Sequence, residues 1–159
     1  MRVTFTKEHR RYRVLVEREL GSTLCSRGPG NDEWLPHDLL HFVAEAELGL
    51  DDGIFGALAA GRPAKVFIPV DPKETAKVWR RNRIKRVRLT DGRRSERLAQ
   101  ELEHAWRKRT LEPELQQKLD ELAERWHSLR IGESMTLEWP RPEGRRRHPP
   151  RDRRRPARR

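Results

Sequence analysis

Residues 35–50 read LPHDLLHFVAEAELGL, and this stretch decides how the chain folds. Its apolar residues recur at helical spacing and fill one arc of a helical wheel. Pro36 suits the start of a helix, because the missing N–H of proline costs nothing there, and Gly49 suits its end. The stretch therefore predicts an amphipathic helix that buries one face. A separate arc carries the polar residues His37, Asp38, His41 and Glu45.

Strand patterns lie at both ends of the first 140 residues. Residues 2–6 and 12–20 alternate apolar and polar side chains and predict a hairpin with the basic stretch KEHRR as its loop. Residues 135–139 alternate in the same way and predict a final strand. We expect this strand to pair with the hairpin, because a two-stranded ribbon alone is marginal in water.

The middle of the chain predicts mostly helices and loops. Residues 98–106 and 113–129 each carry one apolar stripe, and the short joint between them predicts a helical hairpin. The other predicted elements are a loop over 21–33, a short helix over 54–60, an edge strand or loop over 65–70, and a helix over 71–79. The fold class is therefore α+β: a small antiparallel sheet, made of the N-terminal hairpin plus the C-terminal strand, packed with the His-bearing helix and the helical hairpin.

Charge divides the chain into two parts. The 159 residues carry a formal net charge of +11, of which +8 lies in residues 141–159 and +3 in residues 1–140. The final segment has no Leu, Ile, Val, Phe or Trp and is rich in Arg and Pro. We therefore expect one compact domain over 1–140 and a disordered tail over 141–159. Residues 80–97 carry +7, and the sequence leaves open whether they are helix or loop.

Composition excludes several classes of protein. The single cysteine, Cys25, excludes an intramolecular disulfide framework and a Cys-rich zinc module. No apolar run approaches the roughly 20 residues that span a bilayer. The first residues, MRVTFTKEHRRYR, lack the apolar core of a signal peptide. We expect a cytoplasmic protein with no membrane span.

The polar arc of the first helix is a candidate metal site. His37 and His41 are four residues apart, which places two imidazoles on one helix face, and Glu45 lies one turn further along. Two imidazoles and a carboxylate suit one divalent transition metal ion such as Zn²⁺. Asp38 is a candidate for orienting one of the histidines. The alternative is that this arc is the solvated face of an amphipathic helix.

Two resemblances bear on this stretch. The block LPHDLLHFVAEAELGLDDGIFGALAAG, with MRVTFTK near the start and LAERWHSLRIGESMTLEWP near the end, resembles short uncharacterised bacterial proteins. That resemblance implies one compact domain and no particular chemistry. The His-Asp-x-x-His helix is also similar to that of ubiquinone-biosynthesis scaffold proteins, which carry a Glu about a dozen residues later. His37, Asp38 and His41 match that pattern, but this chain departs from it at the comparable downstream position, Gly53, with Asp51 and Asp52 close by. The resemblance therefore carries over the His-Asp-x-x-His residues and does not identify a third ligand.

The basic segments predict a second kind of function. Arginines on a flexible, Pro-rich strand can contact phosphates without a fixed fold, so the sequence favours a module that binds nucleic acid, or an acidic protein, nonspecifically. A GC-rich genome would give the same Arg bias without any such role. The sequence leaves the oligomeric state open, and also whether the chain is an enzyme. The candidate nucleic-acid-binding residues are Arg80, Arg81, Arg83, Arg86, Arg145, Arg146, Arg147, Arg153, Arg154 and Arg155.

Overall fold

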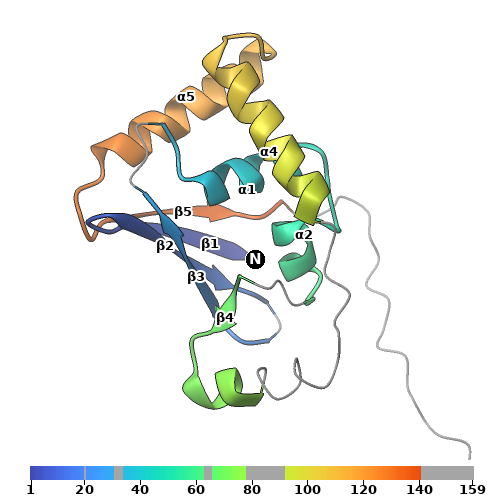
Figure 1. Ribbon diagram of the computed structural model, residues 1–159, viewed down its shortest axis with the longest axis vertical. Helices are drawn as coiled ribbons and strands as arrows, with labels where there is room; N and C mark the ends of the chain where they lie inside the picture. Colours follow the sequence, from blue (N-terminus) through green and yellow to red (C-terminus); the bar gives the residue numbers. More distant parts are fainter. Residues whose placement is uncertain (20, 31–33, 63–65, 78–91, 141–159) are drawn as a thin grey trace, which may run out of the picture.

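A five-stranded antiparallel sheet forms one layer of the protein, and helices cover one of its faces (Figure 1). The computed structural model describes residues 1–19, 21–30, 34–62, 66–77 and 92–140. The strand order is β4-β3-β2-β1-β5. The strands are β1 (Arg2–Lys7), β2 (Arg11–Glu17), β3 (Leu24–Pro29), β4 (Ile68–Pro69) and β5 (Ser134–Glu138). The predicted α+β class is confirmed.

The predicted pairing of the two ends of the domain is also confirmed. β1 and β2 form the hairpin, and β5 lies on the other side of β1. Phe5 on β1 is opposite Val14 on β2 and Met135 on β5, and all three side chains are buried. The alternation seen in the sequence therefore sets the register, since it sends every second side chain of these strands into the core.

The prediction of a loop over residues 21–33 is wrong for residues 24–29, which form β3 along β2. Gly28 and Pro29 are turn formers and favoured a loop. Gly28 lies opposite Tyr12, and a Cβ on Gly28 would lie 2.0 Å from Tyr12 Cζ, so the tyrosine ring occupies the space that a side chain would need. Packing of this ring over the glycine explains why a strand forms here. β4 pairs with β3 at the edge of the sheet, as Pro69 predicts.

The helices are α1 (His37–Glu47), α2 (Ile54–Ala59), α4 (Gly92–Arg107) and α5 (Pro113–Ser128). Residues 72–77 are also helical. α4 includes residues 92–97, so the described part of the basic segment 80–97 is helical. A short connection joins α4 to α5, and the two helices diverge from it (Figure 1). Among the described residues, no helix is long and apolar enough to cross a membrane.

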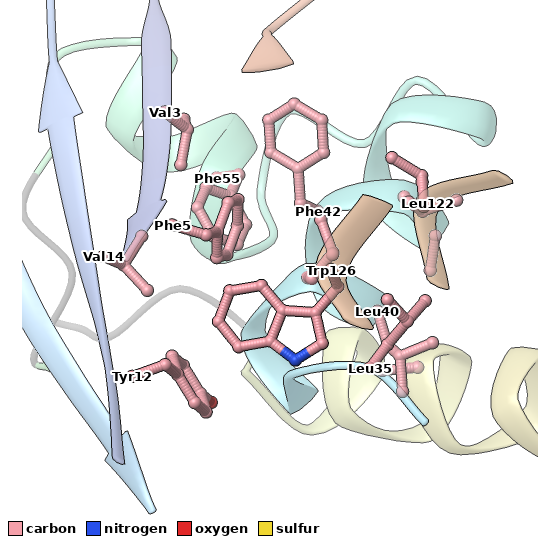
Figure 2. Close-up of a cluster of buried hydrophobic side chains, with 14 of the residues drawn as sticks. Val3, Phe5, Tyr12, Val14, Leu35, Leu40, Phe42, Phe55, Leu122 and Trp126 are labelled. Atoms are coloured by element: carbon pink, nitrogen blue, oxygen red, sulfur yellow. The ribbon is translucent and has the colours of Figure 1, made fainter. Parts of the chain in front are cut away.

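The core lies between the sheet and the helices, and Figure 2 shows its centre. Trp126 of α5 is fully buried and makes an edge-to-face contact with Tyr12 of β2. Phe42 of α1 makes edge-to-face contacts with Phe5 and Phe55. These contacts fix α1 against the sheet on one side, and α4 packs against α1 on the other. The first helix is therefore held between two layers, which determines where its histidines point.

Candidate metal centre

The two histidines of α1 lie side by side on the helix, as their spacing predicts. Their ring centroids are 4.7 Å apart and the rings are nearly perpendicular. His41 is 2% exposed, whereas the His37 side chain is 40% exposed. His41 and Glu45 are both buried, so this arc of α1 is not the solvated face that the sequence left open as an alternative.

Glu96 of α4 completes a cluster with these histidines. Its Oε1 lies 3.2 Å from His37 Nε2, and its Oε2 lies 3.1 Å from His41 Nε2. The potential ligand atoms of His37, His41 and Glu96 all lie within 4.8 Å of one another. Gln100 donates a hydrogen bond of 2.8 Å to Glu96 Oε1 and so helps to orient the carboxylate.

On the other side of its ring, His41 contacts a buried serine. His41 Nδ1 lies 2.7 Å from Ser95 Oγ, and Ser95 donates its hydroxyl hydrogen to Glu45 Oε1. The two ring nitrogens of His41 therefore have different partners: Nδ1 contacts Ser95 Oγ, and Nε2 faces Glu96 Oε2.

Glu45 is held at the start of α2 and does not join the cluster. It is completely buried, and its carboxylate oxygens accept hydrogen bonds from the backbone N–H groups of Ile54, Phe55 and Gly56 at 2.7, 2.8 and 3.0 Å. These are N–H groups that the first turn of a helix leaves without intrahelical partners. The carboxylate comes so close to Gly53 that a Cβ there would lie 2.3 Å from Glu45 Cδ. Glu45 therefore anchors α2, and Ser95 connects it to His41.

The protonation states follow from burial and neighbouring groups. Burial, together with the nearby His37, lowers the pKa of His41, so this imidazole is neutral at neutral pH. Burial acts to raise the pKa of Glu96, but His37, Gln100 and His41 outweigh it, and the net shift is downward. Glu96 is thus a carboxylate.

Asp38, predicted to orient a histidine, contacts Tyr12 and lies near His37. The backbone N–H of Asp38 donates to the Tyr12 hydroxyl at 3.2 Å. Burial raises the pKa of Asp38, whereas the nearby His37 and a hydrogen bond from Tyr12 oppose that shift. The group that contacts the ring nitrogen of His41 away from the cluster is Ser95.

Sequence reasoning placed His37 and His41 together and missed Ser95 and Glu96. Glu96 lies within a segment that carries nine basic residues, and no spacing relates it to α1. The sequence does contain an indication of Ser95. This polar residue interrupts the apolar face of α4 that Ala99, Leu102 and Trp106 form.

The candidate nucleic-acid-binding arginines, which lie at positions 80–86 and 145–155, are outside the described residues, as is the predicted tail over 141–159. No protein-family model matches this sequence, and no curated protein or solved structure matches it either.

Proposed function

We propose that this protein binds one divalent transition metal ion, such as Zn²⁺, through His37, His41 and Glu96. The observation that carries the proposal is the convergence of three ligand groups: the potential ligand atoms of His37, His41 and Glu96 all lie within 4.8 Å of one another. A metal ion bound there would contact the carboxylate and the imidazole nitrogens without protonating His41, a buried imidazole whose pKa is lowered by its surroundings.

The three groups lie close enough to share one ion after small side-chain movements. Zinc lies about 2.0–2.1 Å from its nitrogen and oxygen ligands, which places tetrahedral ligand atoms about 3.3 Å apart. The potential ligand atoms of His37, His41 and Glu96 lie within 4.8 Å of one another, and each histidine nitrogen is 3.2 or 3.1 Å from a different Glu96 oxygen. Three protein ligands leave the fourth position open for water or substrate, as in catalytic rather than structural zinc sites.

The surroundings of the cluster support the same proposal. A histidine that binds a metal usually donates its other ring N–H to an acceptor, which fixes the tautomer and the ring orientation. Ser95 and Glu45 provide this arrangement for His41. Glu45, which the sequence suggested as the third ligand, is not a ligand in this proposal. It contacts Ser95, which in turn contacts the ligand His41.

Calorimetric titration of the full-length, tag-free, metal-stripped chain with Zn²⁺ tests the proposal. We expect one ion per chain, and a loss of affinity of at least a hundredfold in the variants His37→Ala and Glu96→Gln. Both side chains are partly exposed, so these variants should keep the fold. Glu101→Gln is the matched control, because it removes the same charge from an exposed position of α4 five residues further along. No stoichiometric binding, or unchanged binding by Glu96→Gln, would overturn the proposal.

A second candidate function rests on charge. We infer from the +8 in residues 141–159 that this segment binds nucleic acid or an acidic protein nonspecifically. In gel shifts at low salt, a full-length variant with the six arginines of the two clusters, 145–147 and 153–155, changed to Gln should bind DNA more weakly. Its dependence on salt should also be shallower, by about 0.9 in log–log slope for each phosphate that the variant no longer neutralises. Unchanged affinity would exclude the segment as the binding element.

A further inference from the structure

We infer that the open face of the sheet binds a small aliphatic carboxylate, such as a medium-chain fatty acid. The helices, and with them the metal centre of α1 and α4, cover the other face of the sheet (Figure 1). The inference is therefore independent of the proposed metal site. It rests on a groove that combines an apolar lining with two arginines.

A groove of about 350 Å³ lies on this face, over β2, β3 and β4. Its volume is at the small end of the range for ligand sites, which is about 300–1,000 Å³. Successive side chains of a strand point to opposite faces of the sheet. Val14 and Val16 of β2 are buried in the core, so Leu15 between them projects into the groove, beside its cross-strand partner Cys25 of β3.

The groove is lined mainly by aliphatic side chains. Val66, Ile68 and Val70 alternate with two buried residues, and all three are exposed and line the groove. Among the described residues, they are three of the six large apolar side chains that are exposed. Exposed apolar side chains that gather in one place mark a binding surface. Among the described residues that line the groove there is no aromatic ring, so this surface suits an alkyl chain better than a planar ring that needs a stacking partner.

Two arginines make the groove positively charged. Arg13 and Arg27 both line it, and they are direct partners across β2 and β3, where like charges repel. The Nε atom of each lies 3.7 Å from an oxygen of Glu8, which is longer than a hydrogen bond of about 2.7–3.2 Å. Two guanidinium groups also present more N–H donors than one carboxylate can accept. The three side chains together keep a net positive charge, which a second carboxylate would neutralise.

This combination selects the ligand. Guanidinium groups bind carboxylates through paired hydrogen bonds, and Arg13 lies two residues from Leu15 on the same face of β2. A carboxylate held by the arginines can therefore extend an alkyl chain over the aliphatic side chains of the groove.

An extended peptide paired with the edge of the sheet fits less well. The N–H of Val70 donates to the Thr23 carbonyl on the β3 side, so the next position, Pro69, is one that would donate to an added strand. Proline has no N–H to donate. The groove therefore favours a small ligand on the face of the sheet over a strand at its edge.

Calorimetric titration of the full-length, metal-stripped chain with octanoate tests this inference. Without a metal ion, octanoate cannot bind as a ligand of the metal centre. We expect one octanoate per chain. Acetate lacks the alkyl chain and octanol lacks the charge, so each should bind at least about tenfold more weakly.

Four variants examine the two halves of the groove. Arg13→Gln and Ile68→Ser should each weaken octanoate binding by about tenfold. Their matched controls are Arg97→Gln on α4 and Ile131→Ser before β5, which change exposed residues of the same types away from the groove and should stay within about twofold of the unchanged chain.

Cys25 reports where the ligand binds, because it is the only cysteine of the chain and lies in the groove. Octanoate should slow the alkylation of Cys25 by N-ethylmaleimide, along the same saturation curve as the calorimetric titration. Acetate at these concentrations, and octanoate added to the urea-unfolded chain, should leave the rate unchanged.

Several outcomes would overturn the inference. Saturable binding without protection of Cys25 would place octanoate elsewhere on the protein. Equal affinity for octanoate and octanol would indicate general apolar attraction, and equal losses in Arg13→Gln and Arg97→Gln would indicate general electrostatics. An absence of octanoate binding would also overturn it. None of these results bears on Zn²⁺ binding by His37, His41 and Glu96, which is measured separately.

Discussion

Ser95 Oγ lies 2.7 Å from His41 Nδ1, and this contact orients the buried imidazole. Ser95→Ala removes the hydrogen-bond partner of Nδ1, so the imidazole is free to rotate. We expect Zn²⁺ affinity to fall by about 10- to 100-fold, as measured by calorimetric titration. Ser128→Ala, which removes a helix hydroxyl that donates only to the Arg125 carbonyl, should leave Zn²⁺ affinity unchanged. An unaltered affinity in Ser95→Ala would show that the serine does not orient the ligand.

Glu45→Gln tests the anchoring of α2. The amide keeps the shape of the carboxylate, but one of its two acceptor atoms becomes a donor that faces backbone N–H groups. We expect the free energy of unfolding of the metal-free chain to fall by about 3 kcal/mol in urea titrations. Glu47 lies on the same helix as Glu45 and forms an exposed ion pair with Lys118 of α5, so Glu47→Gln should cost about 0.5 kcal/mol or less. Similar reductions in stability in the two variants would contradict the anchoring role.

Gly28→Ala places a methyl group where the Tyr12 ring lies. Tyr12 is in the core and cannot move without disturbing Trp126, so we expect a loss of about 2 kcal/mol or more in the free energy of unfolding. Gly92→Ala meets no atom within 4 Å and should leave stability unchanged or slightly increased. If the two alanine variants unfold at the same urea concentration, then the close packing of Tyr12 over β3 is not a constraint.

Asp120 should make stability depend on pH in acid. Burial acts to raise its pKa, but hydrogen bonds from Trp106, Arg109 and Gln116 outweigh it and hold the pKa below 3.8. The unfolded chain therefore binds a proton at higher pH than the folded chain does. The contribution of Asp120 is complete above the unfolded value and is lost as the pH falls through the lower folded value.

We accordingly expect Asp120→Asn to cost about 1 kcal/mol above pH 5, with the difference from the unchanged chain shrinking below about pH 4. Urea unfolding at several pH values measures this difference. A gap between the two proteins that is constant with pH would mean that the folded carboxyl titrates normally.

The parts of the fold that the sequence predicted are those governed by local pattern. Alternation located β1, β2 and β5, and helical spacing located α1 and brought His37 beside His41. The local pattern did not predict β3, because this strand depends on packing against the ring of Tyr12, which lies on β2.

The sequence did not predict Glu96, the proposed third ligand, for a similar reason. Glu96 is 55 residues from His41, and only the packing of α4 on α1 brings the two side chains together. Glu45 has the right spacing on α1, but the N–H groups at the start of α2 occupy its carboxylate. Local spacing cannot show which of two carboxylates is already engaged, because that depends on contacts between helices.

The pairing of β1 with β5 has a consequence for how the chain reaches its native state. Thr4 and Thr136 bond across this pair although 132 positions separate them. During synthesis, the ribosome releases the first strand long before its neighbour exists, so one edge of the nascent hairpin stays open to other chains. Completion of the sheet therefore waits until β5, the last strand to be made, pairs with β1.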